Sequence, residues 1–123
     1  MFDDTALYSI LLDRLTDGSN MKVSLCLDDQ MFSEGKPPSG KARVRRLQAS
    51  GAEVFLCKGL RRYGSYHVKE IIVDRRVLFT GSANCTTASH NNQERGYRMT
   101  GSVVAEALAD IINDKSRATK WHP

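Results

Sequence analysis

The spacing of apolar residues along this chain predicts alternating helices and strands. From Thr5 to Thr16 apolar side chains recur at intervals of three and four residues, which places them on one face of a helix, and a similar stripe follows Ser102. From Met21 to Leu27 apolar and polar residues alternate, which is typical of a half-buried strand. In chain order we predict a helix at 5–16, a strand at 21–27, a helix from 39 to 51, strands at 52–57, 66–73, 77–80 and 95–100, and a final helix from 102.

Glycine, proline and serine residues mark the connections between these elements. The stretch from Asp28 to Gly40 contains two glycines and two prolines and is predicted to be a loop. Ser39 and Ser102 are predicted to cap the helices that they begin, and residues 74–76 to form the turn of a hairpin. Elements in this order favour an α/β fold, a mixed β-sheet flanked by helices, in a single domain that spans residues 1–123.

Composition places few limits on function. The 123 residues carry a formal net charge of +4, which permits a polyanionic partner without requiring one. The three cysteines, Cys26, Cys57 and Cys85, show no zinc-binding spacing, and their odd number favours a reducing compartment such as the cytoplasm. No apolar run is long enough to cross a bilayer, so we expect no transmembrane segment.

Two polar residues interrupt the strand predicted at 66–73. His67 and Lys69 are two residues apart, so their side chains should leave a strand on the same side, just before the apolar residues that enter the core. The second arm of the hairpin ends in a Gly-Ser-Ala-Asn sequence at 81–84, which returns a hydroxyl and an amide to the same end. An imidazole, a cation and hydrogen-bond donors in one place are suited to binding and attacking a phosphate.

The spacing of these residues resembles a known family motif. His67, Lys69 and Asp74 follow the pattern HxKxxxxD, and the sequence GSxN begins after six further residues. This is similar to the HKD motif of the phospholipase D superfamily, particularly of its bacterial endonuclease and mitochondrial cardiolipin hydrolase branches, which have short chains with one motif. The resemblance implies one phospholipase D-like α/β unit. Family members usually begin with an apolar strand, whereas this chain starts almost at the first helix, so the expectation includes a unit that lacks its first strand.

The same resemblance implies a role for each polar residue of the site. His67 would form a covalent phosphohistidine, and Lys69 would bind a non-bridging phosphate oxygen. Ser82 and Asn84 would donate hydrogen bonds to the same phosphate. The chemistry of the family does not depend on a metal, so the resemblance implies neither a metal site nor a cofactor.

Two acidic residues are open to different interpretations. Glu94 could accept a hydrogen bond from the second ring nitrogen of His67 and so complete the catalytic set, or it could be a solvated loop residue. Asp74 is counted with the catalytic set because it belongs to the motif. Strand parity nevertheless directs it away from His67, so we expect it to stabilise the turn. Arg75 follows it, where many family members have glycine.

One motif supplies one histidine, whereas the reaction needs both a nucleophile and an acid for the leaving oxygen. The family meets this need by bringing two motifs together across a two-fold axis. We therefore expect a homodimer in which the two His67 side chains face each other.

The motif defines the bond that is cleaved but not the substrate. Five basic residues near it would suit the backbone of a nucleic acid, and Tyr63 and Tyr66 could stack on bases. The five are Lys58, Arg61, Arg62, Arg75 and Arg76. We therefore expect a metal-independent phosphodiesterase that acts on nucleic acid. One alternative is a lipid hydrolase acting on cardiolipin or other phosphatidyl substrates, at the mitochondrial surface if an N-terminal anchor is missing. Another is a non-catalytic fragment of a protein with two motifs.

Overall fold

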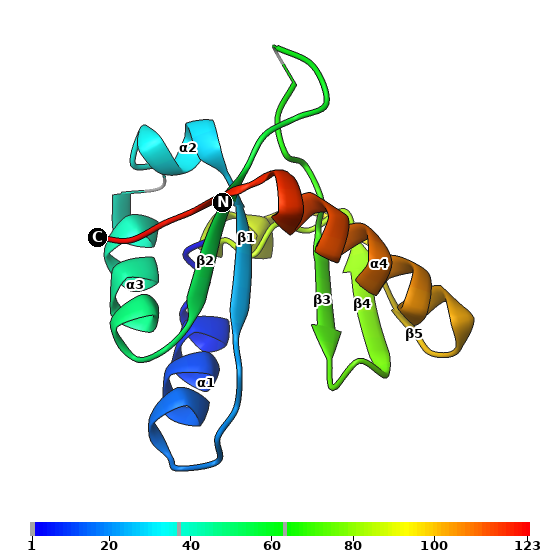
Figure 1. Ribbon diagram of the computed structural model, residues 1–123, viewed down its shortest axis with the longest axis horizontal. Coiled ribbons are helices and arrows are strands. Elements are labelled where there is room, and N and C mark those ends of the chain that lie inside the picture. The colour runs from blue at the N-terminus through cyan, green and yellow to red at the C-terminus, as the bar shows by residue number, and fades with distance from the viewer. Residues whose placement is uncertain (1, 37, 63) are drawn as a thin grey trace.

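The chain folds into β-sheets with helices packed against them (Figure 1). The computed structural model describes residues 2–36, 38–62 and 64–123, and these form two three-stranded sheets. The helices are α1 (Thr5–Thr16), α2 (Asp29–Ser33), α3 (Pro38–Ala49) and α4 (Ser102–Arg117), with a 3-10 helix, η1 (Thr87–Asn91). The strands are β1 (Ser24–Asp28), β2 (Glu53–Cys57), β3 (Glu70–Val73), β4 (Val77–Gly81), β5 (Gly96–Met99) and β6 (Thr119–Lys120). The predicted mixed α/β architecture is confirmed, with its strands divided between the two sheets.

The first sheet has the strand order β1-β2-β6 and is mixed. β1 and β2 run parallel, with Asp28 opposite Cys57 at their carboxyl ends. The chain passes from one to the other through α2 and α3, because parallel neighbours need a crossover connection. β6 adds to β2 in the antiparallel direction, with Lys120 opposite Phe55.

The main hydrophobic core lies between this sheet and the helices beside it. Val44 and Leu47 of α3 and Val54 of β2 are at most 1% exposed. Phe32 of α2 packs edge-on against Trp121, with the ring centroids 5.0 Å apart. The apolar stripes predicted for α1 and α3 therefore face the core of this half of the molecule, except for Ile10 of α1, which was predicted to lie in the stripe but is 58% exposed.

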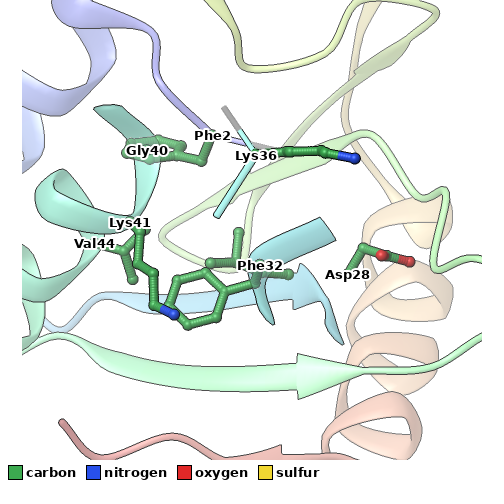
Figure 2. A pocket seen from close by; sticks show the side chains of 8 residues that line it. Phe2, Asp28, Phe32, Lys36, Gly40, Lys41 and Val44 are labelled. Carbon is green, nitrogen blue, oxygen red and sulfur yellow. The ribbon is translucent and has the colours of Figure 1, made fainter. Parts of the chain in front are cut away.

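A small hollow opens at the rim of this core, beside α2 and α3 (Figure 2). Phe2, Phe32 and Val44 contribute to its apolar lining, and the Lys41 ammonium lies 5.4 Å from the centroid of the Phe32 ring. The hollow encloses about 10 Å³, which is no more than the space of one water molecule. It is therefore a packing gap rather than a ligand site.

The second sheet has the strand order β3-β4-β5 and is antiparallel. Leu78 of β4 packs with Val104 and Ala107 of α4, so one face of the sheet is covered by that helix. Because side chains alternate along a strand, Ile71 and Phe79 lie together on the opposite face, where they are 37% and 41% exposed. This half of the molecule therefore buries one face of its sheet and leaves apolar side chains on the other.

The stretch predicted as a loop at 28–40 contains a helix, α2. The Asp28 carboxylate caps it by accepting a hydrogen bond from the Met31 amide at 2.8 Å. The glycines and prolines that follow obscured this short element in the sequence pattern. The prediction of a continuous loop was therefore wrong.

The two predicted serine caps also differ from the structure. α3 begins at Pro38, a residue well suited to the first turn, so Ser39 lies inside the helix and its hydroxyl donates to Asp3 at 3.2 Å. Ser102 is likewise the first residue of α4, and Gly101 occupies the cap position with a φ of 87°. Each predicted cap is thus displaced by at least one residue.

The segment before α1 is attached to the loop after β4. Phe2 forms an isolated parallel bridge with Cys85, and the amides of Asp3 and Asp4 donate to the Cys85 carbonyl at 2.9 and 3.1 Å. This bridge stands where the family resemblance implies a strand. It ties the beginning of the chain to the loop that follows Gly81.

Candidate active site

Except for Asp74, the residues of the predicted site lie on segments that adjoin one end of the second sheet. The last residue pair between β3 and β4 is Glu70 opposite Thr80, and Gly81 of β4 pairs with Gly96 of β5. The start of β3, the end of β4 and the start of β5 therefore share an edge (Figure 1). The strand predicted from Tyr66 begins only at Glu70, so the histidine and lysine of the motif lie on the segment that leads into it.

His67 and Lys69 are in direct contact. The Lys69 Nζ atom lies 2.8 Å from Nδ1 and 3.4 Å from Nε2 of the His67 ring, and it donates to the His67 carbonyl at 3.1 Å. The histidine is exposed and the lysine is half-buried. An exposed imidazole beside a fixed ammonium provides a nucleophile and a positive charge for the same anion.

Ser82 is held beside Glu94 by the pairing of β4 with β5. The Ser82 amide donates to the Arg95 carbonyl at 2.9 Å, and the Arg95 amide donates to the Ser82 hydroxyl oxygen at 3.0 Å. The Ser82 hydroxyl in turn donates to the Glu94 carboxylate. These contacts place a hydroxyl and a carboxylate at the same sheet edge as the imidazole and the ammonium.

Glu94 does not form the predicted hydrogen bond to His67. In the described part of the chain its carboxylate accepts from Ser82 and from the Asn92 amide group, the latter at 3.3 Å. The reason is the register of β4 and β5, which sets Glu94 next to the serine. Glu94 therefore orients the Ser82 hydroxyl and makes no direct hydrogen bond to the His67 ring.

Gly81 is required by a close approach of two strands. A Cβ atom on this residue would lie 2.1 Å from the Arg95 carbonyl oxygen and 2.7 Å from the Cα atom of Gly96. No real Cβ contact is this short, so the glycine permits the strand pairing that positions Ser82.

The loop that carries Asn84 is fixed by a pair of buried hydroxyl groups. Asn84 donates its backbone amide to the Ser89 hydroxyl at 3.2 Å, and Ser89 lies 3.2 Å from the hydroxyl of Thr86. Ser89 and Thr86 are 8% and 5% exposed. Sequence reasoning did not single out this pair, because serine and threonine are ordinary loop residues and only their burial distinguishes them.

Asp74 and Arg75 lie at the opposite end of the hairpin from His67. Both have positive φ angles, 54° and 57°, and the turn is closed by the Arg76 amide donating to the Val73 carbonyl at 3.0 Å. Asp74 therefore belongs to the turn, and the structure does not bring it to the histidine. Arg75 and Arg76 lie in the same turn, so they do not join the basic residues that could flank the site.

A basic loop precedes the motif and lies at the same end as the site. Lys58 and Arg61 are exposed, and Lys58 forms a 3.8 Å ion pair with Asp29. Leu60, between them, is 86% exposed. The loop borders a cavity of about 220 Å³ whose lining residues are Cys57, Lys58, Gly59, Tyr66, Asp114 and Arg117.

Tyr66 is not placed to stack on a base. Its hydroxyl donates to the Asp114 carboxylate at 3.0 Å, and its side chain is half-buried. Burial is the main cause that raises the pKa of this hydroxyl above its ordinary value of 10.0, so it remains a donor at neutral pH. Tyr63, the other predicted stacking residue, lies outside the described residues.

Within residues 2–36, 38–62 and 64–123, the structure has no group of three or more His, Cys, Asp and Glu side chains placed to hold a metal ion. None of the helices in these ranges is long and apolar enough to cross a membrane.

The fold, with the contact between His67 and Lys69 before β3 and that between Ser82 and Glu94 after β4, is that of a phospholipase D-like domain. The family model described as "Cardiolipin synthase, PLD-like domain" matches residues 1–115, and the chain belongs to this family. The crystal structure of a phospholipase D family member, Nuc from Salmonella typhimurium, is similar to this chain with a TM-score of 0.83. The match covers 99% of this chain and 77% of that chain at 18% sequence identity, so it shows a shared fold. The search of curated proteins gave no match.

Proposed function

We propose that this protein is a metal-independent phosphodiesterase in which His67 is the nucleophile. The contact between the His67 ring and the Lys69 ammonium, 2.8 Å apart, is the observation that carries the proposal. A ring nitrogen forms a bond to phosphorus while the bond from phosphorus to the leaving oxygen breaks. Water then attacks phosphorus, the phosphorus–nitrogen bond breaks, and a phosphate monoester is released.

The other residues of the site stabilise charge and set geometry. Lys69 binds a non-bridging oxygen of the phosphate as charge develops there. Ser82 and Asn84 donate hydrogen bonds to the same group. Glu94 orients the Ser82 hydroxyl until the phosphate replaces it as acceptor, which is supported by the contact between these two side chains.

We further propose that the active form is a homodimer. The leaving oxygen needs a proton at the moment when His67 is acting as nucleophile, so a second group must supply it. The partner's histidine fits this role, because a two-fold axis at the sheet edge would bring two copies of the motif together. It protonates the leaving oxygen in the first step and accepts the proton of water in the second.

The basic loop supports nucleic acid as the substrate. Lys58, Arg61 and Arg62 precede the motif at the site end of the sheet, and their positive charge suits repeated phosphates. The loop also supports a second candidate, a phospholipid substrate. Leu60 exposes 86% of its surface between basic residues, and an apolar tip in a basic loop is suited to contact with an anionic bilayer.

The test compares cleavage of single-stranded DNA and of cardiolipin vesicles by the wild type, in EDTA, with the variants His67→Asn and His122→Asn. We expect activity in EDTA that His67→Asn abolishes and His122→Asn retains, because His122 is an exposed histidine in the C-terminal segment. Loss of activity in EDTA would contradict the metal-independent mechanism. Activity that survives His67→Asn would overturn the nucleophile, and no activity on either substrate would favour a non-catalytic domain.

A substitution at Leu60 distinguishes between the two candidate substrates. Leu60→Ser removes the apolar tip without changing the charge of the loop. If the substrate is nucleic acid, cleavage of DNA should be unchanged and should weaken steeply as salt is raised. If the substrate is a lipid, binding to cardiolipin vesicles should fall by about tenfold, since about 1.5–3 kcal/mol accompanies the burial of a leucine side chain.

Dilution tests the dimer. Specific activity should fall below a threshold protein concentration at which sedimentation shows dissociation into monomers. Full specific activity of a species that sediments as a monomer would exclude the requirement for a second histidine.

A further inference from the structure

The segment that carries His67 and Lys69 is not held by a sheet. β3 begins at Glu70, and residues 67–69 belong to no strand in the described part of the chain. The site therefore depends on other contacts to fix the backbone from which the imidazole extends. Tyr66, the residue immediately before His67, makes these contacts.

Tyr66 is anchored at both its backbone and its hydroxyl. Its amide donates to Oδ2 of Asp28 at 2.6 Å, and its hydroxyl donates to Oδ2 of Asp114 at 3.0 Å. Hydrogen bonds to carboxylates are stronger than those between neutral groups. Two such bonds to separate elements leave Tyr66 little freedom to move or rotate.

Both anchors belong to regular secondary structure, one to a strand and one to a helix. Asp28 is 6% exposed, ends β1, and uses its other oxygen to cap α2 through the Met31 amide at 2.8 Å. Asp114 lies in α4 and is paired with Arg117 at 3.1 Å. The first sheet and the long C-terminal helix thus hold, through one tyrosine, the residue next to the nucleophile.

We propose that Asp28 and Asp114 are positioning residues for His67, acting through Tyr66. The inference rests on the proposed function, because it assigns these residues to the placement of the nucleophile. Loss of an anchor lets the imidazole shift relative to the bound phosphate, and a misplacement of about 1 Å can cost about 100-fold in rate. Substrate binding by the basic loop and Lys69 does not require the same precision, so kcat should fall more than KM rises.

Asp28→Asn is the informative variant, and Asp4→Asn is its matched control. Asp4 has the same arrangement, since it caps α1 by accepting from the Leu7 amide at 2.7 Å and bonds a second group, His90, through its other oxygen. In Asp28→Asn the side chain keeps a single oxygen acceptor for two amide donors and cannot serve both as well. In Asp4→Asn the oxygen can still accept from the Leu7 amide while the NH2 group donates to the His90 ring. We expect Asp28→Asn to lower kcat by about 30-fold with KM changed less than about twofold. Asp4→Asn should retain wild-type kcat.

Tyr66→Phe removes the hydroxyl that bonds Asp114, the second anchor, and keeps the aromatic ring. It should lower kcat by about three- to tenfold and leave the unfolding transition nearly unchanged. Equal kcat for the wild type, Asp28→Asn and Tyr66→Phe would overturn the proposal, as would an equal loss in Asp4→Asn.

NMR order parameters of the backbone amides at 67–69 test the proposal independently of activity. Both anchor variants should lower these order parameters from values typical of a rigid backbone, while those of β2 stay unchanged. If the wild type has no phosphodiesterase activity, the proposed function fails and this measurement still tests the anchors. Unchanged order parameters at 67–69 in both variants would overturn the positioning role, even for an active enzyme.

Discussion

The two sheets of this protein differ in how much they bury and in what they do. In the described residues, the core around β1-β2-β6 contains nine buried apolar residues, whereas the cluster under β3-β4-β5 contains three. The proposed site adjoins the second sheet, with His67 on the segment before β3 and Ser82 directly after β4. The larger core supplies rigidity at a distance, through Asp28. We therefore expect core substitutions to cost most stability around the first sheet, and substitutions beside the proposed site or its anchors to lower the rate.

Substitution of Lys69 should have the largest effect on activity and almost no effect on folding. Lys69→Met keeps the length of the side chain but removes its charge, so we expect a loss of about 10³-fold in kcat/KM, which corresponds to about 4 kcal/mol. The free energy of unfolding should change by less than about 0.5 kcal/mol. Steady-state kinetics and urea unfolding check the two halves of this prediction. Lys22 is an exposed lysine before β1, and the control variant Lys22→Met should leave both kcat/KM and the free energy of unfolding unchanged.

Two leucines allow the same substitution in each core. Leu47 is 0% exposed in the larger core and Leu78 is 3% exposed in the smaller one. Leu47→Ala should lower the free energy of unfolding by about 4 kcal/mol and Leu78→Ala by about 2 kcal/mol, because the thin cluster can relax around the lost atoms. Of the two, only Leu78→Ala should reduce kcat in protein that remains folded, since β4 leads directly to the site. Equal stability losses in urea unfolding would remove the distinction between the two cores.

Asp4 links the stability of the first half to pH. The Leu7 amide is the main cause that lowers the pKa of Asp4 below its ordinary value of 3.8, and the His90 side chain lowers it further. A carboxylate with a lowered pKa stabilises the fold above its unfolded pKa, and that contribution is lost as the pH falls through the folded pKa. Asp4→Ala should therefore cost about 1 kcal/mol at pH 7, and the difference from the wild type should shrink below pH 3.8. A difference that stays constant on acidification would contradict this account.

Arg75 should give the smallest effect, with the opposite sign. Its φ of 57° is costly for a residue with a Cβ atom and natural for glycine. Arg75→Gly should raise the free energy of unfolding by about 0.5 kcal/mol, because the relief of strain is partly offset by the greater entropy of the unfolded chain. It should not change kcat, because the turn lies at the far end of the hairpin from the site. Thermal unfolding of the two proteins would show it. A loss of activity would place the turn closer to the chemistry than the fold does.

Local patterns in the sequence predicted much of the fold. The apolar stripe of α1 gave its bounds, and the hairpin turn at 74–76 was found from its position between two apolar arms. The contact between His67 and Lys69 follows from their spacing alone, because residues two apart along a nearly straight backbone lie on one side.

The remaining features depend on distant residues. Glu94 lies beside Ser82 through the register of β4 on β5, which no local pattern specifies. Tyr66 is fixed by partners 38 and 48 residues away in the sequence. The start of β3 could not be located either, because residues 66–69 fit a strand pattern and lack only a neighbour to pair with.

The family motif combines residues that the fold requires with residues that the reaction would require, and Gly81 belongs to the first kind. The residue is required by backbone geometry, since any side chain would collide with the Arg95 carbonyl, whereas His67 is required only by the proposed chemistry. A homologous domain that had lost the histidine but kept this glycine would therefore still build the same sheet edge. Among relatives of this chain, the glycine reports whether the architecture persists, and the histidine reports whether the architecture is still used for catalysis.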